Sequence, residues 1–260
     1  MDYKFKTGIL SGITLIAVII ISVIPPIPQN TNYHFFADSR SEHSIPNFLN
    51  VASNIPFLFI GLFGMWSVRK SSPRFRLKEL SLNCFGFYLG IFFTGIGSAY
   101  YHLHPTNFTL VWDRLPMTIS FMALMSVIIG DFICLKTGKR ILIPLLLIGF
   151  LSIQYWVMTE NRGCGDLRFY ALVQYLPILL IPVILFLFKG NRLKKHYLWL
   201  MILAYGFAKL FEYYDENIFN ALKIISGHTI KHLFAALAPL IFLMGIKSKS
   251  ESLNESGFLS

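Results

Sequence analysis

The dominant feature of this sequence is a series of eight long apolar stretches. They cover Gly8–Ile24, Ile45–Val68, Glu79–Leu103, Leu110–Leu135, Ile141–Met158, Arg168–Phe188, Tyr197–Asp215 and Ile224–Ile246. A helix needs about 20 apolar residues to cross a hydrocarbon core about 30 Å thick, and helices satisfy their own backbone groups within lipid. Since 55% of the residues are hydrophobic and only 14% are charged, we predict an all-α, multi-pass membrane protein.

The basic residues indicate how the chain is oriented. Most of the 23 Lys and Arg residues lie in the N-terminal tail, in the alternate connections near 69–78, 136–140 and 189–195, and just after the last stretch. The positive-inside rule places these segments in the cytoplasm, so both termini are expected there. Anionic lipid headgroups account for the net charge of +10, and no nucleic-acid partner is predicted. The compact connections favour a bacterial inner membrane.

The apolar stretches and the polar tails predict four segments. Residues 1–25 are expected to form an N-terminal transmembrane helix or uncleaved signal anchor, 26–44 an outer loop, 45–246 a seven-span domain, and 247–260 a disordered cytoplasmic tail. A cleaved signal peptide is the alternative for the first segment, but its apolar run ends in Ile24-Pro25-Pro26 without a small-residue cleavage site. The three scattered cysteines imply no disulfide framework.

Several polar residues fall at the outer ends of the predicted spans. Ser98 and His102 stand four apart on one helical face, and Asp113 follows after a short connection. His228 and His232 are one turn apart at the start of the last span. The predicted orientation places all five at the same depth. Ionisable side chains are costly there and tend to mark a function or a compensating pair.

The three histidines have the spacing of a metal site. Histidines at positions i and i+4 place two ring nitrogens within reach of one metal, and a third from a facing helix completes a three-ligand zinc site with an open fourth position. Zinc lowers the pKa of a bound water to about 7. Asp113 is then a candidate to orient or deprotonate this water, and Ser98 to hydrogen-bond the developing oxyanion.

Each of these residues also has a purely structural interpretation. The histidine pair of the last span can form interhelical hydrogen bonds, Asp113 can pair with Arg114 at the interface, and Ser98 can bond its own helix backbone. In the seventh span, three charged residues recur at every third position, and we interpret them as a structural cluster between helices: Lys209, Glu212 and Asp215.

Taken together, these motifs resemble the signature of the alkaline ceramidase family. The resemblance lies in Ser98-x-x-x-His102, Asp113-x-Leu115-Pro116-Met117 and His228-x-x-x-His232, and in the segment from Asn47 to Asn54 that contains Asn50 and Ser53. It covers residues 45 to 246. This family is part of a wider group of seven-span membrane hydrolases that includes adiponectin-type receptors and GPI-remodelling lipases.

The resemblance implies a seven-helix ceramidase-like bundle with one additional N-terminal helix and an outward-facing site. Zinc would be held by His102, His228 and His232, with Asp113 beside the metal-bound water and Ser98 near the substrate carbonyl. The implied reaction is hydrolysis of the amide bond of a ceramide-like lipid that enters from the bilayer. Animal members bind calcium through an acidic N-terminal segment. Here that stretch is Phe36–Glu42, and Asn47 stands where Glu is usual, so calcium is a doubtful second cofactor.

Other functions remain open at this stage. A lipid ester hydrolase of the same superfamily would use the same metal site, and only its substrates would distinguish it. A receptor- or transporter-like protein would bind zinc without turnover, or bind none. A bis-histidine haem site would leave Asp113 and Ser98 without a role.

Overall fold

The structure is a computed structural model and describes residues 1–70 and 77–247. In these residues the extended pairing is limited to one isolated bridge between Glu42 and Ile45, and the regular elements are helical. The predicted all-α class is confirmed. The helices are α1 (Tyr3–Val23), α2 (Phe48–Ala52), α3 (Ile55–Arg69), α4 (Ser81–Leu103), α5 (Asn107–Phe132), α6 (Leu135–Asn161), α7 (Arg168–Leu187), α8 (Lys195–Tyr213), α9 (Asp215–Leu222) and α10 (Gly227–Lys247), with short 3-10 turns η1 (Thr31–His34) and η2 (Lys78–Leu80).

Seven segments of the described chain have the length and hydropathy of membrane spans. One of them consists of α2 and α3, and the others are α1, α4, α5, α6, α7 and α10. They make this a multi-pass membrane protein. The remaining predicted span is α8, which is a helix of 19 residues. It does not reach the same hydropathy because Lys209 and Glu212 lie in its last turns. It nevertheless packs along α10 as part of the bundle.

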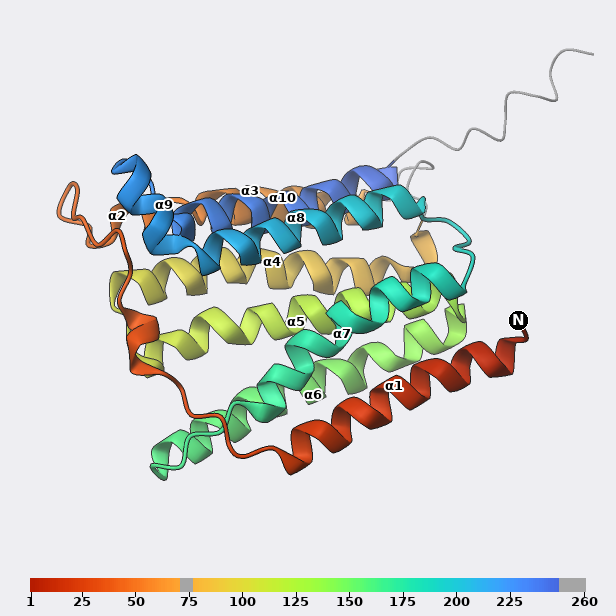
Figure 1. Cartoon of the computed structure of the whole chain (residues 1–260). Coiled ribbons are helices and arrows are strands. Elements are labelled where there is room, and N and C mark those ends of the chain that lie inside the picture. Colours follow the sequence, from red (N-terminus) through yellow and green to blue (C-terminus); the bar gives the residue numbers. More distant parts are fainter. Residues whose placement is uncertain (71–76, 248–260) are drawn as a thin grey trace, which may run out of the picture.

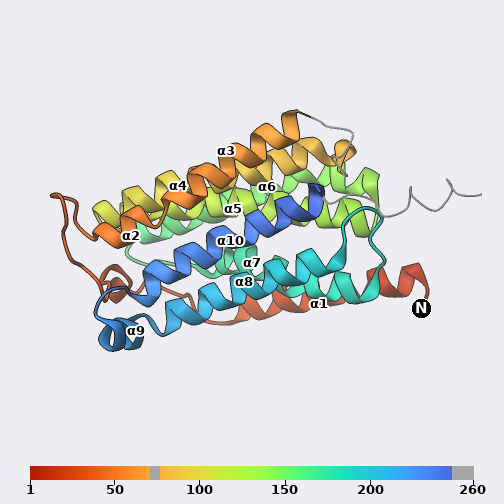
Figure 2. The same cartoon turned by 90° about the horizontal axis from the view of Figure 1, so that it is seen from above.

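The long helices lie side by side in one elongated bundle (Figures 1 and 2). Its core is formed by apolar side chains of α3 to α8 and of α10, such as Phe87, Ile128, Ile184 and Phe242. Helix α1 lies at the edge of the bundle, where it packs on α7 and buries none of its residues. It is therefore an addition to a bundle of seven helices.

The two ends of the bundle differ in what they carry. The N-terminus and the last turn of α10 lie at one end, whereas α2, α9 and the connection that follows α1 lie at the other, which we call the α9 end (Figure 1). This arrangement fits the predicted alternation of basic and non-basic connections. Which end faces the cytoplasm stays a prediction. The expected disordered tail lies, from residue 248 onward, outside the described residues.

Two local features of the α9 end depart from the predicted spans. The second span is broken, because α2 ends at Ala52 and α3 begins at Ile55 with Pro56 in its first turn. Proline cannot donate a backbone hydrogen bond and favours such a helix start. The short helix α9 was not predicted, since eight residues of mixed polarity do not register as a span. It ends at Leu222 and is followed by Lys223, which has a left-handed backbone with φ of 58°.

Candidate metal centre

Three histidine side chains from two helices meet at the α9 end. His102 lies in the last turn of α4, and His228 and His232 lie in the first two turns of α10. All three are buried, with exposed fractions of 1%, 6% and 3%. The ring centroids of each pair are 4.9 Å apart. The rings therefore surround a common point, and the structure brings together the three histidines that the sequence singled out.

The spacing of the ring nitrogens suits a metal ion. Ligand nitrogens of the three residues all lie within 4.8 Å of one another, and Nε2 of His102 is 3.3 Å from Nε2 of His228. Two nitrogens that each lie about 2.0–2.1 Å from a zinc ion at the tetrahedral angle are about 3.3–3.4 Å apart. Imidazole is also a preferred ligand of zinc. The donor set thus fits the metal that the family resemblance implies.

Ser53 fixes the orientation of one of these rings. Its Oγ donates to the carbonyl of Asn50 at 3.0 Å and lies 2.7 Å from Nδ1 of His232. Because the hydroxyl proton is used, Nδ1–H of His232 donates to Ser53 and the Nε2 lone pair is left for a metal. Nδ1 of His102 is buried without a hydrogen-bond partner in the described structure. The sequence motif contained Ser53 but gave it no such role.

Asp113 and Ser98 lie beside the histidines. Ser98 precedes His102 by one turn in α4, and Asp113 lies in the second turn of α5. Ser98 and Asp113 both line the same cavity as His232. The structure thus brings the two predicted catalytic residues together beside the histidine cluster.

Arg114 directs its guanidinium away from its neighbour Asp113. Its Nη2 donates to Oε1 of Gln29 at 2.7 Å. The guanidinium carbon also lies 4.7 Å and 5.0 Å from the ring centroids of Trp156 and Tyr170, a cation–π arrangement. These contacts hold Arg114 against aromatic rings, so the alternative of an Asp113–Arg114 pair is not supported. Asp113 is left partly accessible from the cavity.

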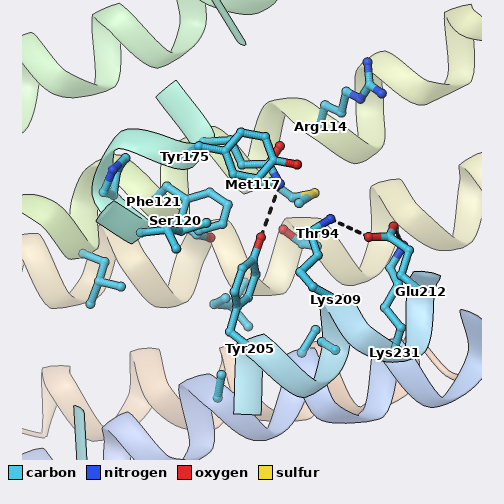
Figure 3. Close-up of a pocket in the computed structure, with 18 of the residues that line it drawn as sticks. Thr94, Arg114, Met117, Ser120, Phe121, Tyr175, Tyr205, Lys209, Glu212 and Lys231 are labelled. Carbon is cyan, nitrogen blue, oxygen red and sulfur yellow. Dashed lines mark hydrogen bonds and ion pairs between the residues drawn. The ribbon is translucent and has the colours of Figure 1, made fainter. Parts of the chain in front are cut away.

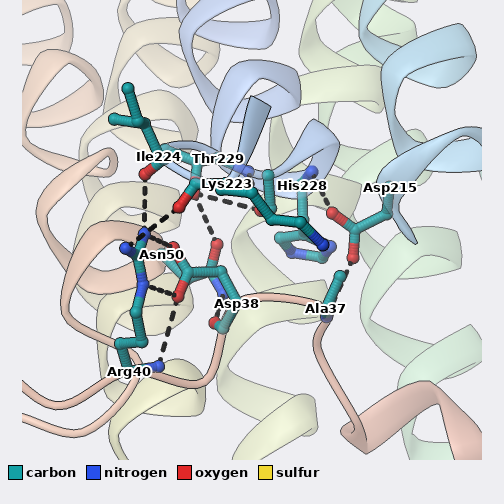
Figure 4. Close-up of polar contacts among 10 residues, drawn as sticks. Ala37, Asp38, Arg40, Asn50, Asp215, Lys223, Ile224, His228 and Thr229 are labelled. Carbon is teal, nitrogen blue, oxygen red and sulfur yellow. Dashed lines mark hydrogen bonds and ion pairs between the residues drawn. The ribbon is translucent and has the colours of Figure 1, made fainter. Parts of the chain in front are cut away.

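The start of α10 is held in place by polar contacts from several segments (Figure 4). The backbone N–H of His228 donates to Oδ1 of Asp215 at 2.7 Å, and the N–H of Ala37 donates to Oδ2 at 3.3 Å. The hydroxyl of Thr229 donates to Oδ1 of Asn50 at 2.8 Å. A carboxylate at a helix N-terminus satisfies free N–H groups and the helix dipole. Asp215 thereby positions the helix that carries two of the histidines.

The charged cluster predicted in α8 is real but differs in membership. Glu212 forms ion pairs with Lys209 and, at 2.7 Å, with Lys231 of α10. Asp215 does not join them, because the helix turns at Tyr214 and Asp215 caps α10 instead. The sequence pattern could not reveal this, since the capped N–H lies 13 residues further along the chain. It also gave no role to Lys231, whose Nζ is 3.4 Å from Nε2 of His228.

In the segment Phe36–Glu42, which the resemblance aligns with a calcium-binding stretch, an arginine pairs with the acidic side chain of Asp38. Both carboxylate oxygens of Asp38 accept from the Arg40 guanidinium at 2.7 Å. The same guanidinium also donates to the carbonyls of Lys223 and Ile224 (Figure 4). In the described residues, the histidines are the group of three or more candidate ligands close enough to hold a metal. Because Arg40 takes both carboxylate oxygens of Asp38, the contacts of this segment do not favour a calcium site.

A cavity of about 650 Å³ opens beside the histidine cluster. Its wall is mostly apolar, with Phe57, Phe87, Ile91, Leu124 and Ile181 among its lining residues. Polar side chains of α4, α5, α8 and α10 also line it, and Figure 3 shows Lys209 and Glu212 reaching into it from α8. The volume is in the range of small-molecule sites, and an apolar wall with a few polar groups suits an amphiphilic ligand.

Comparisons with known proteins agree with the motifs. A comparison with curated protein sequences finds no significant match. The family model Ceramidase matches residues 38–250, which include α2 to α10, all three histidines, Ser98 and Asp113. Helix α1 precedes the matched region, in agreement with its peripheral place in the bundle. With this match over most of its length, the chain belongs to the Ceramidase family.

Proposed function

We propose that this protein is a zinc-dependent amidase that hydrolyses ceramide-like lipids. The observation that carries the proposal is the placement of Asp113 and Ser98 next to three buried histidines, at one wall of an apolar cavity. A lipid acyl chain would lie along the apolar wall, with its amide group beside the histidines. Membership of the Ceramidase family supports an amide substrate.

His102, His228 and His232 are the proposed ligands of the metal. When bound there, zinc would supply a Lewis acid that polarises the amide carbonyl and acidifies water. Ser53 would keep His232 in the tautomer whose Nε2 can bind the metal, because its Oγ accepts from Nδ1–H. All three rings are buried, so a metal held by them would be separated from bulk solvent and reached through the cavity.

Asp113 and Ser98 carry the proposed proton transfer and charge stabilisation. Asp113 would orient the attacking water and accept its proton, then return a proton to the departing amine. The Ser98 hydroxyl lines the same cavity as Asp113, and it would donate to the oxygen of the former carbonyl as negative charge develops there. Both groups lie on rigid helices, so their separation is set by the packing of α4 on α5.

The membrane arrangement is part of the proposal. Residues 45–246 would form the catalytic domain and residues 1–25 an additional membrane anchor. The basic connections would face the cytoplasm and the α9 end the opposite side of the membrane, as expected for a bacterial inner membrane protein.

The test compares zinc content with turnover in three variants of the full-length protein. Asp113→Asn should retain zinc and lose activity by roughly 10²–10⁴-fold, as for removal of a general base. His228→Ala and His232→Ala should lose both zinc and activity. Zinc would be measured by mass spectrometry, and turnover with a short-chain fluorescent ceramide and a matched lipid ester.

The possible outcomes separate the competing functions. Full activity in the zinc-free histidine variants would remove the metal from the mechanism. Preferential turnover of the ester would reassign the protein to the lipid ester hydrolases. A wild-type protein that holds zinc but hydrolyses neither substrate would favour a receptor-like function.

A further inference from the structure

The two lysines beside the metal centre leave the cavity with an excess of positive charge. Its described lining includes three basic side chains, Arg114, Lys209 and Lys231, against two acidic ones, Asp113 and Glu212. Arg114 is held against aromatic rings by the contacts described above. On α8 and α10, the two ammonium ions of Lys209 and Lys231 share the single carboxylate of Glu212, so this group carries one positive charge in excess. A cation held at the histidines would only increase this excess.

The geometry of this group leaves N–H donors free. Each ammonium has three donors, and Glu212 accepts one from each lysine, from Lys209 at Oε2 and from Lys231 at Oε1. Nζ of Lys231 also lies within hydrogen-bond distance of Nε2 of His228, so among the described residues two donors of Lys209 and one of Lys231 are left over. The side chains of Lys209 and Lys231 remain 37% and 18% exposed. Both lysines line the cavity, and Figure 3 shows Lys209 and Glu212 side by side on its wall.

Lys231 links this group to the metal centre. Its Nζ is 3.4 Å from Nε2 of His228, a nitrogen that belongs to the proposed ligand set. The Lys231 ammonium and a metal cation held at the histidines would repel each other strongly in a low-dielectric site unless an anion lies close to both. Glu212 supplies one such charge, and an anionic group of a bound lipid would supply another. The cavity thus combines an apolar wall for a chain with a cationic corner beside the reacting centre.

We propose that the substrate is a lipid amide whose amine portion carries an acidic oxygen group, as in an N-acyl amino acid, and that Lys209 and Lys231 bind this group. The proposal rests on the proposed amidase function. It keeps the acyl chain and the amide bond of a ceramide-like lipid and replaces the neutral sphingoid alcohol with an acidic amine portion. The same carboxylate chemistry has a second source, the fatty acid released by hydrolysis. The experiment below includes an arm for each source.

The first measurement is binding to the full-length protein after its metal has been removed with a chelator. N-oleoylglycine and N-oleoylethanolamine share an acyl chain and an amide bond and differ in the carboxylate. We expect N-oleoylglycine to bind more tightly, as measured by native mass spectrometry from detergent micelles. Lys209→Met should reduce this preference by roughly 10- to 100-fold, the effect of losing a charge-assisted hydrogen bond in a partly buried site. Lys139→Met, at an exposed lysine outside the cavity, should preserve it.

The second measurement is the ratio of kcat/KM for the two amides in the zinc-loaded protein. Lys209→Met and Lys231→Met should both lower the ratio of glycine to ethanolamide hydrolysis, whereas Glu212→Gln should keep or raise it because both ammonium groups become free. A purely structural ion-pair cluster predicts something different. In that case Lys209→Met and Glu212→Gln lower the unfolding temperature alike and leave the substrate ratio unchanged, which overturns the proposal.

A third comparison, of hexadecanoic acid with hexadecanol, identifies the source of the anion. If Lys209→Met weakens hexadecanoic acid binding but the wild type binds both amides equally, the lysines hold the released fatty acid and the headgroup proposal is wrong. If neither amide is hydrolysed while the binding preference for N-oleoylglycine and its loss in Lys209→Met are observed, the amidase function fails but the anion site stands.

Discussion

Gly97 of α4 lies directly against the backbone of Trp112 in α5. A Cβ atom at position 97 would be 1.9 Å from the Trp112 carbonyl oxygen and 3.2 Å from the backbone nitrogen of Asp113. Such a contact is impossible without moving one of the helices. The absence of a side chain at Gly97 therefore sets how closely Asp113 approaches Ser98, the residue that follows Gly97.

Gly97→Ala is accordingly predicted to damage the site through the backbone. The added methyl group must push α4 and α5 apart beside Ser98 and Asp113, a form of overpacking that costs about 1–3 kcal/mol. We expect a lower unfolding temperature in detergent and a loss of turnover. Gly86→Ala is the matched control, because on the same two helices its Cβ would meet Ala123 at 3.6 Å, an ordinary contact. Equal effects of the two substitutions would argue against this account.

Ser53→Ala is predicted to weaken metal binding without removing a ligand. The substitution deletes the oxygen that accepts from Nδ1 of His232 at 2.7 Å, and loss of such an outer partner typically costs 10- to 100-fold in metal affinity or activity. Zinc affinity would be measured by competition with a chelator. Ser67→Ala on α3 is the control, since the Ser67 hydroxyl donates to the carbonyl of Phe63 in its own helix. An unchanged zinc affinity in Ser53→Ala would mean that the tautomer of His232 is fixed by something else.

Much of the fold could be predicted from the sequence because lipid imposes a simple length rule. Seven of the eight predicted spans each correspond to one helix, the second corresponds to α2 and α3 together, and the outer ends differ by up to six residues. The rule fails where polar contacts decide the backbone. The break at Ser53 and Asn54 lies inside an apolar run, and α9 is too short and too polar to be recognised by hydropathy.

The candidate site was predicted less completely than the fold. Residues spaced by one helical turn, such as His228 and His232, could be placed on one face from the sequence, and α4 supplied the third ring. The roles of Ser53 and Asp215 depend on contacts between segments 179 and 13 residues apart. No local pattern encodes such distances. Lys231 stood between the two histidines, but its ion pair with Glu212 became visible only from the packing of α10 on α8.

The orientation of the bundle predicts which connections can be labelled from each side of the membrane. In a background without the three native cysteines, a cysteine at the exposed position Lys189 should react only with a reagent that reaches the cytoplasm. A cysteine at Asn161, which lies at the opposite end of the bundle, should react with an impermeant reagent added outside. The positive-inside rule gives this direction. The reverse pattern would place the α9 end and the histidines on the cytoplasmic side.

The Asp38–Arg40 pair at the α9 end predicts a pH dependence of stability. The Arg40 guanidinium lowers the pKa of the Asp38 carboxyl from its usual value of 3.8. A carboxyl group whose pKa is lower in the folded state than in the unfolded state stabilises the fold above the unfolded value, and this contribution is lost as the pH falls through the folded value. Because Arg40 also donates to Lys223 and Ile224, ahead of α10, the stabilisation acts on the helix that carries His228.

Asp38→Asn tests this linkage directly. The variant should unfold at a lower temperature than the wild type at neutral pH, and the difference should shrink as the pH falls below 3.8, the usual carboxyl value, because the wild type then loses the same charge. Thermal unfolding in detergent between neutral and acidic pH measures both curves. Glu216→Gln, at an exposed carboxylate of α9, should follow the wild type throughout. A constant gap between Asp38→Asn and the wild type would show that the carboxylate charge does not contribute. Asp38 would then stabilise the fold only through the geometry of the hydrogen bonds that it accepts from Arg40, which asparagine reproduces only in part.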